Sequence, residues 1–108
     1  MFASTAHATA KSDTYSCPKL AKENGQLERA SGIDLFSGPP SELAQLKPDN
    51  DEDDTGPGFW TLDRSESDYW YECIYESRGA TLEFKLPRAY ARCTNMGTGK
   101  VWDKLRCN

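Results

Sequence analysis

The alternation of apolar and polar residues is clearest between Tyr69 and Leu86. Two runs rich in aromatic and β-branched residues, 69–76 and 80–86, flank a three-residue connection that contains a glycine. This pattern predicts an antiparallel hairpin, in which side chains alternate between two faces. With Glu76 opposite Ala80, we expect a core face that carries Trp70, Ile74, Leu82, Phe84 and Leu86. The other face of the first strand is then a tyrosine stripe, formed by Tyr69, Tyr71, Cys73 and Tyr75.

Shorter apolar runs predict further strands at residues 33–36, 59–62, 89–93 and 101–107. Between them, residues 41–46 are expected to form one or two helical turns, with Ser41 as the N-cap and Pro48 ending the helix. Turns are predicted at Asn24-Gly25 and over residues 94–100. We therefore expect a mainly β fold, a small antiparallel sheet or sandwich with one short helix.

Length and composition restrict the function. The chain has 108 residues, enough for one small domain, and only 37% of them are hydrophobic. Mean hydropathy is -0.76, and no apolar run approaches the roughly 18 residues of a membrane span. The net charge of -4 argues against nucleic-acid binding; it suits either a basic protein partner or simple solubility, between which charge alone does not choose.

The four cysteines are Cys17, Cys73, Cys93 and Cys107. An even number in a small polar chain is typical of disulfides. A zinc site is disfavoured, because the sequence has no Cys-x-x-Cys pair and its one histidine is His7. Three pairings are possible, and the sequence does not choose among them. We favour Cys93–Cys107 with Cys17–Cys73, since the former closes a local loop worth on the order of 3 kcal/mol.

Residues 1–10 resemble the end of an export signal, because Ala8-Thr9-Ala10 has the small-x-small form of a cleavage site. The domain is then expected to comprise residues 11–108, without a histidine, in the oxidising periplasm. The alternative is a floppy N-terminal tail.

An acidic run follows the expected helix and contains Asp51, Glu52, Asp53 and Asp54. So many neighbouring carboxylates predict an exposed loop. The spacing of Asp49, Asp51 and Asp53 fits half of a calcium loop, but position six is not glycine and position twelve is Trp60. We therefore expect no metal, and keep calcium as an alternative.

Catalytic motifs are missing from the sequence. There is no glycine-rich phosphate loop and no G-x-S-x-G, and the cysteines are expected to be structural. Glu72, Glu76 and Glu83 on the hairpin are typical of a solvated surface rather than of a glycosidase pair. We expect neither an enzyme nor a cofactor.

Two features could bind a protein. Dense negative charge at Asp51–Asp54 would steer a cationic partner, and tyrosines at positions 69, 71 and 75 would supply stiff contact area. Each has a structural alternative: the loop could only solubilise the chain, and the tyrosines could pack under the N-terminal arm around a Cys17–Cys73 bridge.

Several landmarks carry a family resemblance. They are Cys17-Pro18, residues 38–49 (GPPSELAQLKPD), residues 60–62 (WTL), residues 69–75 (YWYECIY), Leu86-Pro87 and Cys93. The chain resembles a group of small periplasmic proteins of Gram-negative bacteria, some encoded among type VI secretion genes and immunity-like. The resemblance implies export, disulfides and a non-catalytic role.

The leading hypothesis is a periplasmic immunity protein that binds and blocks a basic, cell-wall-degrading effector. A host-lysozyme inhibitor is the second hypothesis. A calcium- or small-ligand-binding module, with the acidic run as its site, is an alternative of another class.

Overall fold

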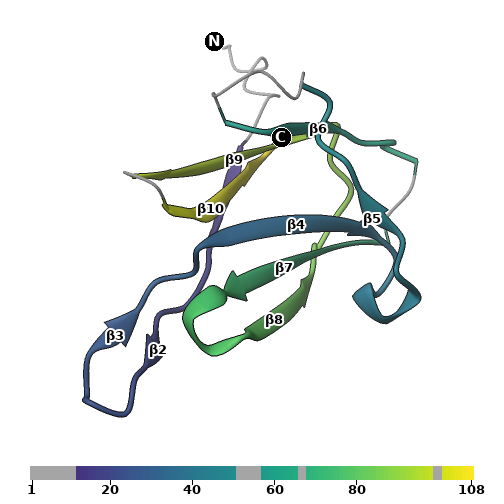
Figure 1. The fold of residues 1–108 in the computed structure, drawn as a ribbon. Coiled ribbons are helices and arrows are strands. Elements are labelled where there is room, and N and C mark those ends of the chain that lie inside the picture. The colour runs from purple at the N-terminus through teal and green to yellow at the C-terminus, as the bar shows by residue number, and fades with distance from the viewer. Residues whose placement is uncertain (1–11, 51–56, 66–67, 99–100) are drawn as a thin grey trace, which may run out of the picture.

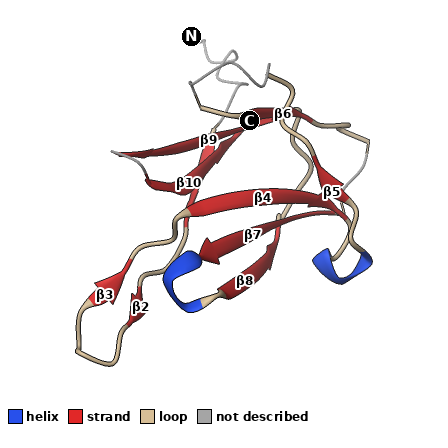
Figure 2. Ribbon diagram, in the orientation of Figure 1, coloured by secondary structure: helices blue, strands red, loops and turns tan. Residues whose placement is uncertain are grey.

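The computed structural model describes residues 12–50, 57–65, 68–98 and 101–108. Their strands form two four-stranded antiparallel sheets and a two-stranded ribbon (Figures 1 and 2). We call the first sheet A: it contains β1 (Asp13–Ser16), β10 (Val101–Cys107), β9 (Arg92–Thr98) and β6 (Phe59–Thr61), in that order. Sheet C contains β5 (Gln45–Leu46), β4 (Gly32–Ser37), β7 (Tyr69–Tyr75) and β8 (Ala80–Lys85). The expected mainly antiparallel β fold is confirmed.

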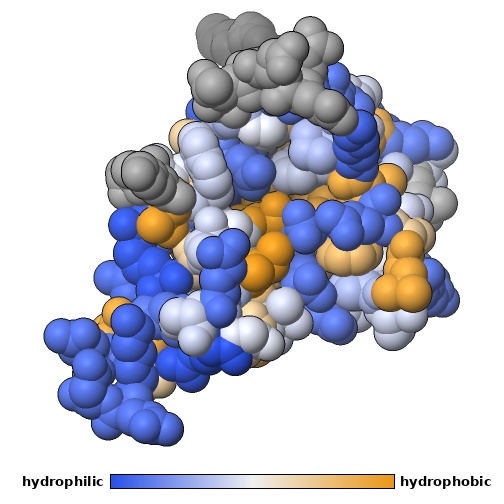
Figure 3. Space-filling model, in the orientation of Figure 1, coloured by the Kyte–Doolittle hydropathy of each residue, from blue (hydrophilic) through white to orange (hydrophobic). Residues whose placement is uncertain are grey.

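The ribbon pairs β2 (Leu20–Ala21) with β3 (Leu27–Glu28) and projects from the body of the molecule (Figure 1). Its turn contains the predicted Asn24-Gly25, and Gly25 has φ 86°, a left-handed conformation that glycine adopts without steric cost. Figure 3 shows the ribbon as mainly polar, although Leu27 on β3 is 61% exposed, and hydrophobic side chains also reach the surface over the body.

The hairpin register was predicted wrongly by one residue. Tyr75, not Glu76, faces Ala80, because η3 (Glu76–Arg78) makes a 3₁₀ turn that the left-handed Gly79 closes. A shift of one residue moves every side chain of one strand to the other face of the sheet. Consequently the side chains that share a face with Leu82 and Phe84 are those of Tyr69, Tyr71, Cys73 and Tyr75.

The expected tyrosine stripe is therefore buried. Tyr69, Tyr71 and Tyr75 are at most 8% exposed, and Trp70 and Ile74 occupy the opposite face. The structural alternative holds: Tyr75 donates to the Pro18 carbonyl, and the Tyr15 ring lies 5.7 Å from that of Tyr71. Tyr71 and Tyr75 thus pack beneath the N-terminal arm, whereas the Tyr69 hydroxyl accepts a hydrogen bond from Asp63 N at 3.0 Å.

Both favoured disulfides are present. Cys17 bonds to Cys73, and Cys93 bonds to Cys107 across two neighbouring strands of sheet A. All four lie in one core between the sheets. The largest fully buried side chains there are Tyr75, Leu35, Leu86 and Leu105 with three of the cysteines.

The expected helix at residues 41–46 is only a single 3₁₀ turn, η2 (Pro40–Glu42). Leu43 ends it with φ 60°, a strained conformation for a non-glycine residue, and is 84% exposed. Ser37 N then donates to the Ala44 carbonyl at 3.0 Å, and the chain returns as β5. Strand pairing thus outweighs the local helical pattern.

Two other boundaries differ from the expectation. The strand expected at residues 89–93 begins at Arg92, and β9 runs through most of the expected turn to Thr98. Pairing with β10 extends it. Among the described residues, no helix is long and apolar enough to cross a membrane.

Candidate protein-binding surfaces

Three carboxylates lie in one row across the outer face of sheet C. Asp34 on β4 faces Glu72 on β7, and Glu72 faces Glu83 on β8. The hydrogen bond from Leu86 N to the Tyr69 carbonyl, 2.9 Å long, shows which β7–β8 pairs exchange backbone hydrogen bonds. Hydrogen-bonded and non-hydrogen-bonded pairs alternate along two antiparallel strands, so Glu72 and Glu83 form a non-hydrogen-bonded pair. In such a pair the two side chains come closest. Like charges directly opposite each other destabilise a sheet.

The electrostatics follow from this row. Burial raises the pKa of Asp34. The pKa of Glu72 is also raised, by burial first and then by the neighbouring charges of Asp34 and Glu83. Both shifts mean that the folded protein holds these groups ionised at neutral pH against an energetic cost.

Apolar side chains flank the row. Phe36 faces Trp70 on one side of it, and Ile74 faces Thr81 on the other. Phe36 is buried, whereas Trp70 and Ile74 are partly exposed. We call this surface, with Asp34, Glu72 and Glu83 at its centre, the acidic face. Aromatic residues are enriched in protein interfaces, and the carboxylates beside them make this surface a candidate for a cationic partner.

The outer face of sheet A has the opposite charge. It carries Arg92, Lys104 and Arg106, which we call the basic face. A depression of about 380 Å³ between the two arginines is also lined by Met96 and Asn108. The Arg92 guanidinium lies 4.2 Å from the centre of the Phe59 ring, a cation–π contact.

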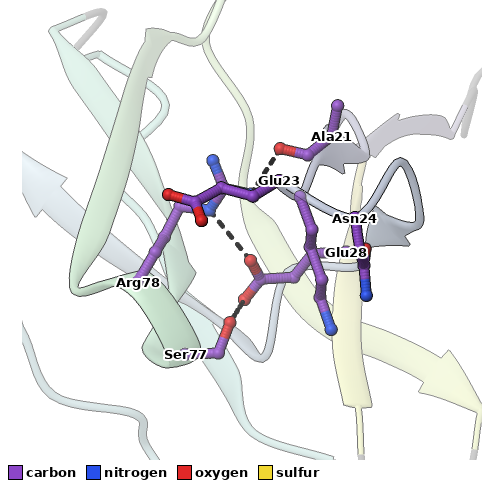
Figure 4. Close-up of a pocket in the computed structure, with 7 residues that line it drawn as sticks. Ala21, Glu23, Asn24, Glu28, Ser77 and Arg78 are labelled. Carbon is purple, nitrogen blue, oxygen red and sulfur yellow. Dashed lines mark hydrogen bonds and ion pairs between the residues drawn. The ribbon is translucent and has the colours of Figure 1, made fainter.

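A larger groove, of about 600 Å³, separates the ribbon from η3 (Figure 4). Glu28 reaches into it, accepting hydrogen bonds from Ser77 Oγ and, at 2.9 Å, from Arg78 Nε. Arg78 also donates to the Ala21 carbonyl at 2.6 Å. The hydrogen bond from Ser77, followed by the charge of Arg78, lowers the pKa of Glu28. These groups satisfy one another, so their role is to anchor the ribbon.

The predicted acidic contacts Asp51, Glu52, Asp53 and Asp54 lie outside the described residues. Just before them, the Asp49 carboxylate accepts from Thr61 N at 2.5 Å, and Asp49 N donates to the Phe59 carbonyl at 2.8 Å. The residue just before the acidic run is thus held against β6. The described residues contain no cluster of three or more metal-ligand side chains, and the acidic run lies outside them, so calcium stays an alternative.

The predicted partner contacts at Tyr69, Tyr71 and Tyr75 lack the exposed surface expected of them. Sequence reasoning missed the acidic face, because the residues that form it come from three strands. Asp34 between Ile33 and Leu35 is the one local signal, a charge at the outward position of an alternating strand.

Fold and surfaces together define a small, disulfide-bonded β domain suited to protein binding. Residues 22–108 match the model of the Type VI secretion system Tli immunity protein family, and the chain belongs to that family. Searches of the curated proteins and of the solved structures gave no match.

Proposed function

We propose that this chain is a periplasmic immunity protein that binds a cell-wall-degrading effector and blocks its activity. The observation that carries the proposal is the family match over residues 22–108. The two disulfides support an oxidising compartment such as the periplasm. The acidic face supplies the first contact.

Charge supports that choice of surface. Peptidoglycan is anionic, so enzymes that act on it tend to present basic clefts. A row of ionised carboxylates steers such a partner into contact and is relieved of its own repulsion when cations approach. Trp70 and Ile74 then add apolar contact on both sides of the row. The run Asp51–Asp54 is proposed as a second source of steering charge.

The binding test compares the two outer faces. The acidic-face variant carries Asp34→Asn, Glu72→Gln and Glu83→Gln, and the matched control carries Arg92→Gln, Lys104→Gln and Arg106→Gln. With the effector encoded beside the protein, the first should bind roughly 10- to 100-fold more weakly, mainly through slower and less salt-dependent association. The control should change affinity by less than about threefold. Equal effects of both variants would remove the acidic face from the interface.

The loop is tested separately. Replacing Asp51, Glu52, Asp53 and Asp54 with their amides should slow association without changing dissociation. Unchanged association kinetics would remove the loop from the encounter.

The effector class is tested by activity. The effector should release fragments from purified peptidoglycan, and stoichiometric addition of this protein should stop it. Parallel assays with phospholipid vesicles and with host lysozymes separate the alternatives: lipid hydrolysis or lysozyme inhibition would overturn the cell-wall-effector assignment. Failure to bind or neutralise any type VI effector would overturn the immunity role itself.

A further inference from the structure

The structure leaves one edge of sheet C open. β8 is its terminal strand and, within the described residues, pairs with β7 alone (Figure 1). Because Leu86 exchanges backbone hydrogen bonds with β7, so do Phe84, Leu82 and Ala80. The N–H and C=O groups of Thr81, Glu83 and Lys85 therefore point away from the sheet. Such an edge is a template for another strand.

The side chains of β8 also favour an added strand. Leu82 and Phe84 pack against the core yet stay partly exposed at the edge. The Phe84 ring stacks on Tyr71, with centroids 5.2 Å apart, so it is already held in place. A neighbouring strand would cover apolar surface without reordering it.

We propose that a second copy of this chain occupies this edge, with the two β8 strands antiparallel about a two-fold axis. When Phe84 faces its counterpart, Glu83 of one copy faces Lys85 of the other, twice by symmetry. Glu83 and Lys85 are also the residues with outward backbone groups, so these pairs can exchange backbone hydrogen bonds across the interface. One register therefore satisfies the backbone, opposite charges and the aromatic pair together.

The carboxylate row gives an independent reason for this register. The row ends at the edge with Glu83, whose neighbour on β7 is another carboxylate. Lys85 lies 3.8 Å from Asp68, an ion pair half-exposed to solvent and correspondingly weak. In the dimer, Lys85 of the second copy extends the row with a positive charge. Pairing thus offsets part of the negative charge that, after burial, raises the pKa of Glu72.

Affinity should be modest. A single strand pair buries less area than the roughly 1,200 Å² typical of stable interfaces. We expect reversible association in the micromolar range, independent of any effector, so this proposal and the proposed function can fail separately.

Sedimentation velocity from about 1 to 500 µM tests the dimer on the oxidised full chain. The wild type should shift from monomer to dimer as its concentration rises. Glu83→Lys and Lys85→Glu alone should each stay monomeric at concentrations at least tenfold above the wild-type midpoint. Mixing those two variants should restore a heterodimer, because each lysine then faces a glutamate. The double swap Glu83→Lys/Lys85→Glu should dimerise like the wild type. A single cooperative thermal unfolding transition of each variant controls for folding.

Amide hydrogen exchange gives a second readout. The Glu83 and Lys85 amides should exchange more slowly as concentration rises, while the Thr94 amide on sheet A should not. A wild type that stays monomeric throughout would overturn the proposal. Protection of the two β8 amides only when an effector is present would assign the edge to the effector instead.

Discussion

The outer faces of the two sheets carry similar numbers of charges but arrange them in opposite ways. On sheet A each cation has uncharged cross-strand neighbours: Thr61 faces Arg92, Ser16 and Met96 face Lys104, and Thr14 and Thr94 face Arg106. On sheet C the three carboxylates face one another. The basic face is arranged for stability, whereas the acidic face is not.

Anions that serve stability are placed differently in this molecule. Asp103 is buried and accepts from Arg29 Nε at 2.9 Å, and its pKa is lowered by that hydrogen bond. Glu28 is held in the same way by Ser77 and Arg78. Among the residues that the structure describes, no such cation compensates the carboxylates of the acidic face. Burial raises the pKa of Asp34 and, together with the charges of Asp34 and Glu83, that of Glu72. Their arrangement fits a surface completed by a partner.

The largest effect should come from the disulfides, which fix the two sheets differently. Cys17–Cys73 closes a separation of 56 residues and holds the N-terminal arm over sheet C, whereas Cys93–Cys107 closes 14 within sheet A. Replacing both cysteines of a pair with serine should cost about 4 kcal/mol for the first and about 3 kcal/mol for the second. Urea unfolding measures both. The reverse order would show that the constraint within sheet A matters more than loop length.

A smaller effect separates the faces by charge alone. Glu72→Gln should raise the free energy of unfolding by about 0.5 kcal/mol, because it removes the central charge of the row. Lys104→Gln on the basic face should be neutral within about 0.3 kcal/mol. Thermal unfolding of the two variants compares them, at a protein concentration below that at which the dimer is expected to form. A destabilised Glu72→Gln protein would mean that the row is compensated in the isolated chain.

The smallest effect is a pH dependence. Because the pKa values of Asp34 and Glu72 are raised in the folded state, folding takes up protons between the ordinary carboxyl value of about 4 and those raised values. The energetic cost of holding Asp34 and Glu72 ionised in the folded protein is therefore present at pH 7, and it is relieved as the pH falls through that window. The stability advantage of Asp34→Asn/Glu72→Gln over the wild type should shrink between pH 7 and about pH 4, because that range spans the whole window. A constant advantage, measured by urea unfolding at both values, would contradict the shifts.

Local patterns in the sequence were sufficient for much of the fold. Alternation located β4, β6, β7, β8 and β10 to within a few residues, and the cysteine spacing favoured the observed pairing. At the expected helix the pattern misled because strand pairing prevailed. Leu43 and Leu46 read as one side of a helix, but the pairing of Leu46 with Leu35 makes β5 a strand.

The candidate site shows the same division more sharply. The sequence by itself determined that the chain is β-rich, acidic and disulfide-bonded, because composition and alternation act within a few residues of each position. Only the tertiary structure decided which charges face each other. A single extra residue in the turn at η3 buried the tyrosines and brought Glu72 opposite Glu83, since side chains on a strand alternate with a period of two. The position of Asp34 beside them depends on β4–β7 pairing across 38 residues of chain, which no local pattern encodes.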